Sequence, residues 1–177
     1  LDRTLDQRQT NTAFTYRLGA VYNVTKYFNV YSSLSSFFKP QRITLSPEVV
    51  YMHPDGTEMS DSELRSFKPL TGRQWEVGLH LDLGTELSLS AAAYHITLNN
   101  MVRTNLGTAA DGRKIGGPIG KSVSKGIELE MRYAPSTAFD FSLGYSLTDA
   151  RIAEYTSSKF VKNVTAGNRL KRVPLDK

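Results

Sequence analysis

The sequence predicts an all-β protein, an antiparallel up-and-down meander of about six to seven long strands that crosses a membrane. Three observations lead to this prediction. Apolar and polar residues alternate along most of the chain. The alternating stretches run for about 10–13 residues, whereas strands of soluble proteins have about 5–6 and a bilayer is crossed by about 9–11. Short and long connections also follow one another in strict alternation.

The composition agrees with a folded domain. The chain has 177 residues, of which 40% are hydrophobic and 22% charged, so it is not a disordered segment. Its net charge is +5, but the lysines and arginines are scattered and form no basic helix, so we expect no nucleic-acid partner. Cysteine is absent, which excludes disulfides and thiol chemistry. No apolar run reaches the ~18 residues of a membrane-spanning helix.

The first predicted hairpin joins strands at 13–22 and 27–37 through a tight turn at 23–26. In the first strand the apolar residues share one face: Phe14, Tyr16, Leu18, Ala20 and Tyr22. In the second strand they divide between two faces, with Phe28, Val30 and Leu34 on one and Tyr27, Tyr31 and Phe37 on the other.

The second hairpin joins 73–83 and 86–98 through the turn 82–85. One face of 73–83 is apolar: Trp75, Val77, Leu79, Leu81 and Leu83. The apolar pattern of 86–98 changes face around residues 91–93, and a β-bulge there would reconcile the two halves.

The third hairpin joins 122–133 and 138–148 through the turn 134–137, and a further strand begins beyond it. Long connections remain at 38–70, 100–121 and 151–168, and no capped helix is predicted in them. Short turns on one rim and long loops on the other are typical of outer-membrane barrels. Because hydrocarbon offers no backbone partners, the strands must belong to a closed wall that is larger than this chain.

The stretch 116–132 contains Gly120-Lys121-Ser122, an ending found in phosphate-binding P-loops. The P-loop spacing requires a glycine at position 115, which is Ile115, and a helix after the lysine. The residues that follow alternate as a strand, so we interpret the stretch as a barrel strand and its loop.

No catalytic or metal-binding constellation appears. His53, His80 and His95 lack a metal-ligand spacing. Glu76, Glu128 and Glu130 lie on polar strand faces, as expected of a barrel interior.

Several motifs resemble the TonB-dependent outer-membrane receptors, in their order and spacing. They are SFKPLTGRQWEVGLHLDL (66–83), AAAYHITLNNMV (91–102), GKSVSKGIELEMRY (120–133), SLGYSLTDARI (142–152) and GNRLKRVP (167–174). The resemblance is greatest to the ferric-siderophore branch. It implies a barrel of about 22 strands around a plug, of which residues 1–177 form part of the wall, without plug or final strands.

The resemblance also implies a function. The whole protein would take up a ferric siderophore through the bacterial outer membrane, driven by the TonB complex acting on the plug. Its partners would be the ferric siderophore, TonB and outer-membrane lipid; no enzymatic activity and no resident cofactor are expected. Cobalamin, haem or a saccharide remain alternative cargoes, and a self-contained soluble β-barrel binding module remains an alternative of another class.

Any ligand contacts in this chain should lie on the long loops. Aromatic rings can stack on a planar chelate, and cationic groups can attract an anionic one. The candidate ligand-binding residues are Tyr51, His53, Phe67, Arg103, Arg113 and Lys114.

Overall fold

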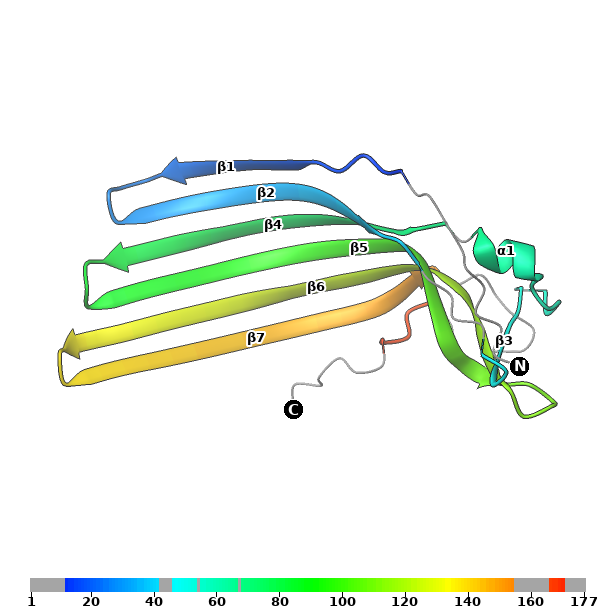
Figure 1. Ribbon diagram of the computed structural model, residues 1–177. Helices are drawn as coiled ribbons and strands as arrows, with labels where there is room; N and C mark the ends of the chain where they lie inside the picture. Colours follow the sequence, from blue (N-terminus) through cyan, green and yellow to red (C-terminus); the bar gives the residue numbers. More distant parts are fainter. Residues whose placement is uncertain (1–11, 42–45, 54, 67, 155–165, 171–177) are drawn as a thin grey trace.

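The computed structural model describes residues 12–41, 46–53, 55–66, 68–154 and 166–170. Within this part of the chain there are seven strands and one short helix (Figure 1). They are β1 (Arg17–Asn23), β2 (Phe28–Lys39), β3 (Val49–Tyr51), α1 (Asp61–Arg65), β4 (Leu70–Leu83), β5 (Leu87–Thr108), β6 (Lys114–Ser136) and β7 (Phe139–Glu154). No helix in the described ranges is long and apolar enough to cross a membrane.

Six of the strands form the predicted antiparallel meander. β1, β2, β4, β5, β6 and β7 pair with their neighbours in this order. Figure 1 shows them side by side in one curved layer, with tight turns at one end and the longer connections at the other. Residues 166–170 then return along β7, where the Leu170 N–H donates to the Ala150 carbonyl at 2.8 Å. The expected meander and the beginning of a further strand are therefore confirmed.

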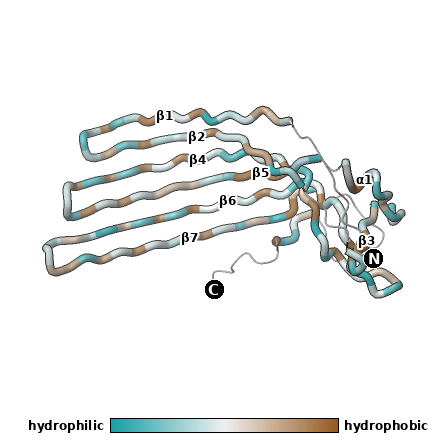
Figure 2. The backbone as a smooth tube through the Cα atoms, in the orientation of Figure 1, coloured by the Kyte–Doolittle hydropathy of each residue, from teal (hydrophilic) through white to brown (hydrophobic). Residues whose placement is uncertain are grey.

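One face of this sheet, the apolar face, is formed by alternate residues of every strand. Register places Leu18, Leu34 and Trp75 beside one another on β1, β2 and β4. Their exposed fractions are 64%, 38% and 55%. Figure 2 shows hydrophobic and hydrophilic residues alternating along the strands. A large apolar surface with its backbone fully paired in the sheet suits hydrocarbon rather than water.

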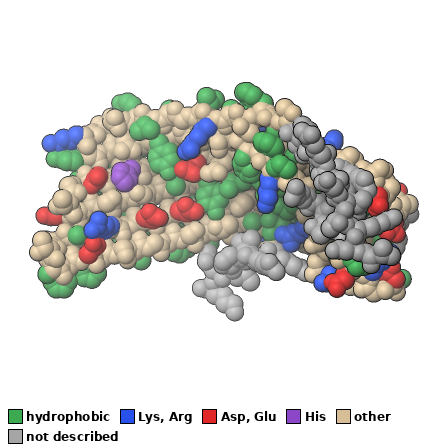
Figure 3. All heavy atoms as spheres, in the orientation of Figure 1, with side chains coloured by type: hydrophobic (Ala, Val, Ile, Leu, Met, Phe, Trp, Pro, Cys, Tyr) green, Lys and Arg blue, Asp and Glu red, His purple; other side chains and the backbone are tan. Residues whose placement is uncertain are grey.

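The opposite face, the polar face, carries Glu76, His80, Glu128 and Glu130. Hydrogen bonds join its side chains across strands, such as the one between His80 Nδ1 and Ser90 Oγ at 2.8 Å. Figure 3 views the sheet from a side on which acidic side chains and a histidine lie over the strands. This is the surface expected for a hydrated barrel interior.

Aromatic rings cover glycines on the polar face. Tyr31 lies opposite Gly78, and a Cβ on Gly78 would come within 2.6 Å of the Tyr31 ring. Tyr94 lies over Gly126 in the same way, with its hydroxyl 2.8 Å from Thr148 Oγ1. Large rings thus lie flat across neighbouring strands where a side chain is missing.

β5 and β6 extend well past the other strands and bend, as Figure 1 shows. The pairing between them shifts register at three places after Leu98, and Asn100 and Gly120 have positive φ of 59° and 78°. The expectation of a long loop at 100–121 was wrong, since only residues 109–113 connect the two strands. Outside a bilayer both faces of a ribbon can be polar, so alternation no longer reveals it.

The connection between β2 and β4 contains two elements that the sequence did not predict. β3 pairs in parallel with the start of β6, from Val49 opposite Lys114 to Tyr51 opposite Gly116. α1 begins at the N-cap Ser60 with a complete capping box to Glu63. No helix was predicted from the sequence, although residues 60–63 have the S-x-x-E pattern that indicates the start of one.

The β-bulge that would have reconciled the apolar pattern at residues 91–93 is absent. Pairing of β5 with β4 runs without a break from Leu87 to Asn99. Ala91 and Ala93 therefore stay on the apolar face, and Tyr94 and Ile96 belong to the polar face. The apparent change of face reflects small side chains on one face and large ones on the other.

Candidate functional site

The long connections meet in one loop cluster, defined by the described residues of 46–69 and by the bent β5–β6 ribbon at 99–120. It lies at the end of the sheet away from the tight turns (Figure 1). The most buried side chains of the described chain gather here, including Val50 at 1% and Ile119 at 0% exposed. The cluster therefore has a small core of its own, while the strands below expose both faces.

Backbone hydrogen bonds attach β3 to the ribbon. The Met52 N–H donates to the Gly116 carbonyl at 2.9 Å, and the Lys114 N–H donates to the Glu48 carbonyl at 2.8 Å. On the other side of the ribbon, Asn100 Nδ2 donates to the Pro69 carbonyl at 3.1 Å. The connection is thus fixed at both of its ends.

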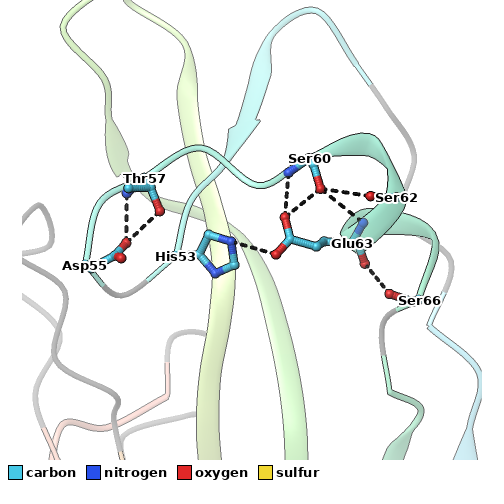
Figure 4. Close-up of polar contacts among 7 residues, drawn as sticks. All are labelled: His53, Asp55, Thr57, Ser60, Ser62, Glu63 and Ser66. Carbon is cyan, nitrogen blue, oxygen red and sulfur yellow. Dashed lines mark hydrogen bonds and ion pairs between the residues drawn. The ribbon is translucent and has the colours of Figure 1, made fainter.

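A tight turn follows β3. The His53 N–H donates to the Thr57 carbonyl at 2.8 Å. Asp55 Oδ1 accepts from the Thr57 N–H at 2.9 Å and from its hydroxyl at 2.8 Å (Figure 4). These hydrogen bonds lower the pKa of Asp55, the one from the Thr57 backbone most. The turn brings the His53 side chain back toward α1.

His53 and Glu63 meet at the start of α1, where His53 Nε2 lies 3.1 Å from Glu63 Oε1 (Figure 4). The other oxygen of Glu63 accepts from the Ser60 hydroxyl at 2.6 Å and from the Ser60 N–H at 2.8 Å. The Ser60 hydroxyl is the main cause of a lowered pKa of Glu63, followed by the Ser60 N–H and by His53. Glu63 therefore stays ionised and holds both the helix start and the imidazole.

A cavity of about 390 Å³ opens between this pair and the bent ribbon. Its lining includes His53, Met59, Glu63 and Lys68 from the connection and Asn100 and Pro118 from the ribbon. The lining combines a cation, an anion, an imidazole and apolar groups. Such a mixture suits a small polar ligand with apolar parts.

The predicted ligand residues do not all share this cavity. His53 lines it. Tyr51 is 4% exposed, with its ring against Gly116, and burial raises the pKa of its phenol, so its position favours a packing role. Phe67 lies outside the described residues.

The three predicted cations lie elsewhere on the ribbon. Arg113 is engaged by Asp111 Oδ2 at 2.6 Å and by Glu58 Oε1 at 3.5 Å, and the Asp111 contact raises its pKa. Arg103 is half-buried opposite Gly117 on β6. Lys114 is exposed at the first position of β6.

Sequence reasoning missed Met59, Glu63, Lys68 and Asn100. The capping-box pattern could have identified Glu63 as fixed in place. Nothing in the local pattern marks Lys68 or Asn100, since they come together through the pairing of β4 with β5 and the hydrogen bond from Asn100 to Pro69. Among the described residues, no group of three histidine or carboxylate side chains could hold a metal ion.

Comparisons with known proteins agree on the architecture. A family model described as "TonB dependent receptor-like, beta-barrel" matches residues 2–177. The metal-pseudopaline receptor CntO from two Pseudomonas aeruginosa strains, UCBPP-PA14 and PAO1, is 26% identical over 173 residues. That match covers 97% of this chain and 21% of the relative, so the chain spans about a fifth of those curated relatives' length.

A solved structure is similar as well. The alcaligin outer membrane receptor FauA from Bordetella pertussis matches with a TM-score of 0.55 and 17% identity, over 85% of this chain and 24% of that one. At this identity the similarity shows the fold, in which the sheet is a fragment of a larger barrel. Proteins of this family are transporters rather than enzymes. The match along nearly the whole sequence shows that the chain belongs to the TonB-dependent receptor β-barrel family of the bacterial outer membrane.

Proposed function

We propose that this chain supplies barrel wall and outer loops to a receptor that imports a ferric siderophore. The observation that supports the proposal most is the cavity of about 390 Å³ in the loop cluster. It lies at the loop end of a wall whose family consists of outer-membrane receptors. The structural neighbour FauA is named as an alcaligin receptor.

The loop cluster is built to present this cavity without rearrangement. β3 is attached to β6 by its backbone, and the capping box fixes the start of α1. A ligand would therefore meet side chains that are already placed, which lowers the entropy cost of binding. Lys68 is exposed and can attract an anionic chelate, while Met59 and Pro118 offer apolar contacts.

Energy coupling is part of the proposal. The family resemblance implies that a plug fills the barrel and that TonB acts on the plug. The polar face would then line the interior beside that plug, which suits its carboxylates and hydroxyls. The residues that contact TonB would belong to the plug and not to this part of the wall.

A second cargo class is favoured by a specific finding. The relative CntO is named as a receptor for metal-pseudopaline, and its match extends along 97% of this chain. A metal chelate other than a ferric siderophore is therefore the second candidate. The imidazole of His53 and the carboxylate of Glu63 suit polar chelates of either class.

The test uses the complete receptor in its own cell. A deletion strain and a complemented strain would be supplied with ⁵⁵Fe-loaded siderophores, with ⁶³Ni or ⁶⁵Zn chelates, with cobalamin, with haem and with oligosaccharides. The proposal expects uptake of a ferric siderophore to be lost on deletion and restored by the gene. Loss confined to a nickel or zinc chelate would establish the second candidate, and loss of cobalamin, haem or saccharide uptake alone would refute both.

A further inference from the structure

The apolar face ends in a row of polar side chains toward the loop cluster. Register places Trp75, His95, Lys125 and Asp149 beside one another on β4, β5, β6 and β7. One step farther from the tight turns, the same face of β4 carries Arg73. The polar residues thus begin at the same level on β5, β6 and β7, and one step later on β4.

The depth of this row corresponds to the outer boundary of the bilayer. From Leu83 to Trp75, β4 rises about 20 Å, given roughly 3.3 Å per residue and a tilt of about 40°. The apolar band of an outer-membrane barrel is about 25 Å tall. Lys125 and its neighbours therefore lie within about 5 Å of the level where acyl chains give way to lipid headgroups, a gap that a lysine side chain can span.

A groove of about 430 Å³ lies directly beneath the row, on the same face. Its walls are Trp75, Ile127 and Leu147, which are 55%, 48% and 39% exposed. Its floor is low because Ala93, on the same face, carries only a methyl group. The groove is apolar, narrow and open toward the hydrocarbon.

The charge above the groove is positive. Asp149 is already engaged by Arg151 Nε at 2.9 Å and by Arg169 Nε at 3.6 Å. Lys125 and Arg73 are exposed and make no ion pair or hydrogen bond with the described part of the chain. Lys125 also lines the groove, so its ammonium can reach the head of a molecule whose tail lies in it.

An apolar groove below free cations matches one kind of occupant. A phosphate-bearing lipid has an acyl chain for the groove and an anionic head for Lys125 and Arg73. A soluble protein cannot reach this depth, because unpaired backbone groups are not tolerated in hydrocarbon. A second receptor copy would bring its own apolar face and no phosphate.

We propose that this surface is a binding site for an anionic, phosphate-bearing lipid of the outer leaflet. One acyl chain lies over Ala93 between Trp75, Ile127 and Leu147, and the phosphate is held by Lys125 and Arg73. The bound acyl chain fills the groove over Ala93 and thereby makes the apolar face of the wall continuous. The site is independent of which cargo the receptor imports.

Native mass spectrometry of the delipidated full-length receptor in mild detergent tests this proposal. The probes are bis-phosphorylated lipid A and diacylglycerol, which lacks phosphate. The wild-type receptor is expected to retain lipid A and not diacylglycerol. Lys125→Glu should lower the apparent affinity for lipid A about tenfold, the effect of losing one charged hydrogen bond. Ala93→Phe fills the groove without changing charge and should weaken lipid A binding to a similar degree.

Lys26→Glu is the matched control, since Lys26 lies beside Tyr27 at the tight-turn end. It should bind lipid A like the wild type. Heat-modifiable gel mobility verifies that each variant has folded. The proposal is overturned if Lys125→Glu or Ala93→Phe binds lipid A as the wild type does, if diacylglycerol binds equally well, or if the receptor appears as a lipid-free dimer.

Discussion

At the scale of single residues, the clearest constraints are glycines that make room for aromatic rings. A Cβ at Gly78 would lie 2.6 Å from the Tyr31 ring and 2.7 Å from the Ala91 carbonyl oxygen. Displacing the ring would also break the hydrogen bond from the Tyr31 hydroxyl to Glu76 Oε1 at 3.0 Å. The sequence shows these glycines as polar-face positions, but it does not show that they are occupied by a neighbour's ring.

We therefore expect Gly78→Ala to destabilise the barrel by about 1–3 kcal/mol, as other overpacking substitutions do. The free energy of unfolding of the full-length receptor in detergent, measured by denaturant titration, checks this. Gly144→Ala is the control, because a Cβ there would meet no atom of the described residues within 4 Å. Equal effects of the two substitutions would contradict the close packing at Gly78.

Lys68 and His53 line the cavity, and we expect both to contribute to ligand binding. Lys68→Glu reverses the charge beside the ligand position, and His53→Ala removes the imidazole. Each should weaken binding of the imported chelate about tenfold, the usual effect of one lost charged hydrogen bond. Binding of the labelled chelate to cells measures this, and Lys26→Ala at the opposite rim should bind as the wild type does.

At the scale of elements, α1 depends on one carboxylate. The pKa of Glu63 is lowered in the folded protein from 4.5, so its contribution to local stability is present above that value. It is lost as the pH falls through the lower, folded value. Glu63→Ala should thus increase amide hydrogen exchange at residues 60–64 at pH 7.

The difference between Glu63→Ala and the wild type should disappear once the pH falls well below 4.5, when the wild-type carboxyl is protonated. Asp61→Ala is the matched control, since Asp61 is also acidic and in the first turn but lies outside the capping box. A difference that persists undiminished in acid would show that the charge of Glu63 does not hold the helix.

The loop cluster should behave as a unit that is separate from the wall. Ile119, on the ribbon, is 0% exposed, and Ile119→Ala should cost about 2–5 kcal/mol of local stability. Limited proteolysis on intact cells should then cut the 46–69 connection faster while the barrel stays folded. Ile127→Ala, on the same strand but 48% exposed on the apolar face, should leave the cleavage rate unchanged.

Some of the secondary-structure elements could be predicted from the sequence and others could not. The six long strands, and the faces of those that alternate cleanly, were predictable because a bilayer on one side and water on the other impose a period of two. The faces of β5 were not, because its apolar face carries small residues at 91 and 93. The extension of β5 and β6 was not, since its register shifts interrupt the period of two and part of it packs against β3. β3 depends on a three-residue pairing with a strand far along the chain, which no local pattern reveals. For the cavity, the sequence pointed to His53 but not to Lys68, whose place depends on the pairing of β4 with β5.

At the scale of the whole molecule, the sheet is open at both edges. Within the described residues, β1 and β7 each pair with one long neighbour only, and the large apolar residues Phe141 and Leu143 are both 54% exposed. The isolated 177 residues should therefore associate or require detergent. Analytical ultracentrifugation in water checks this, and a monodisperse, cooperatively folding monomer would contradict the wall assignment.

The central claim is that alternate residues of one strand face lipid and the barrel interior. This chain has no cysteine, so once any cysteines elsewhere in the receptor are replaced, labels can be introduced singly at Glu76, Val77, Leu79 and His80. Spin labels on the full-length receptor in liposomes, probed with oxygen and with a water-soluble nickel complex, measure the environment of each position. We predict high oxygen accessibility at 77 and 79 and high nickel accessibility at 76 and 80. Equal accessibility to the nickel complex at all four positions would contradict the account.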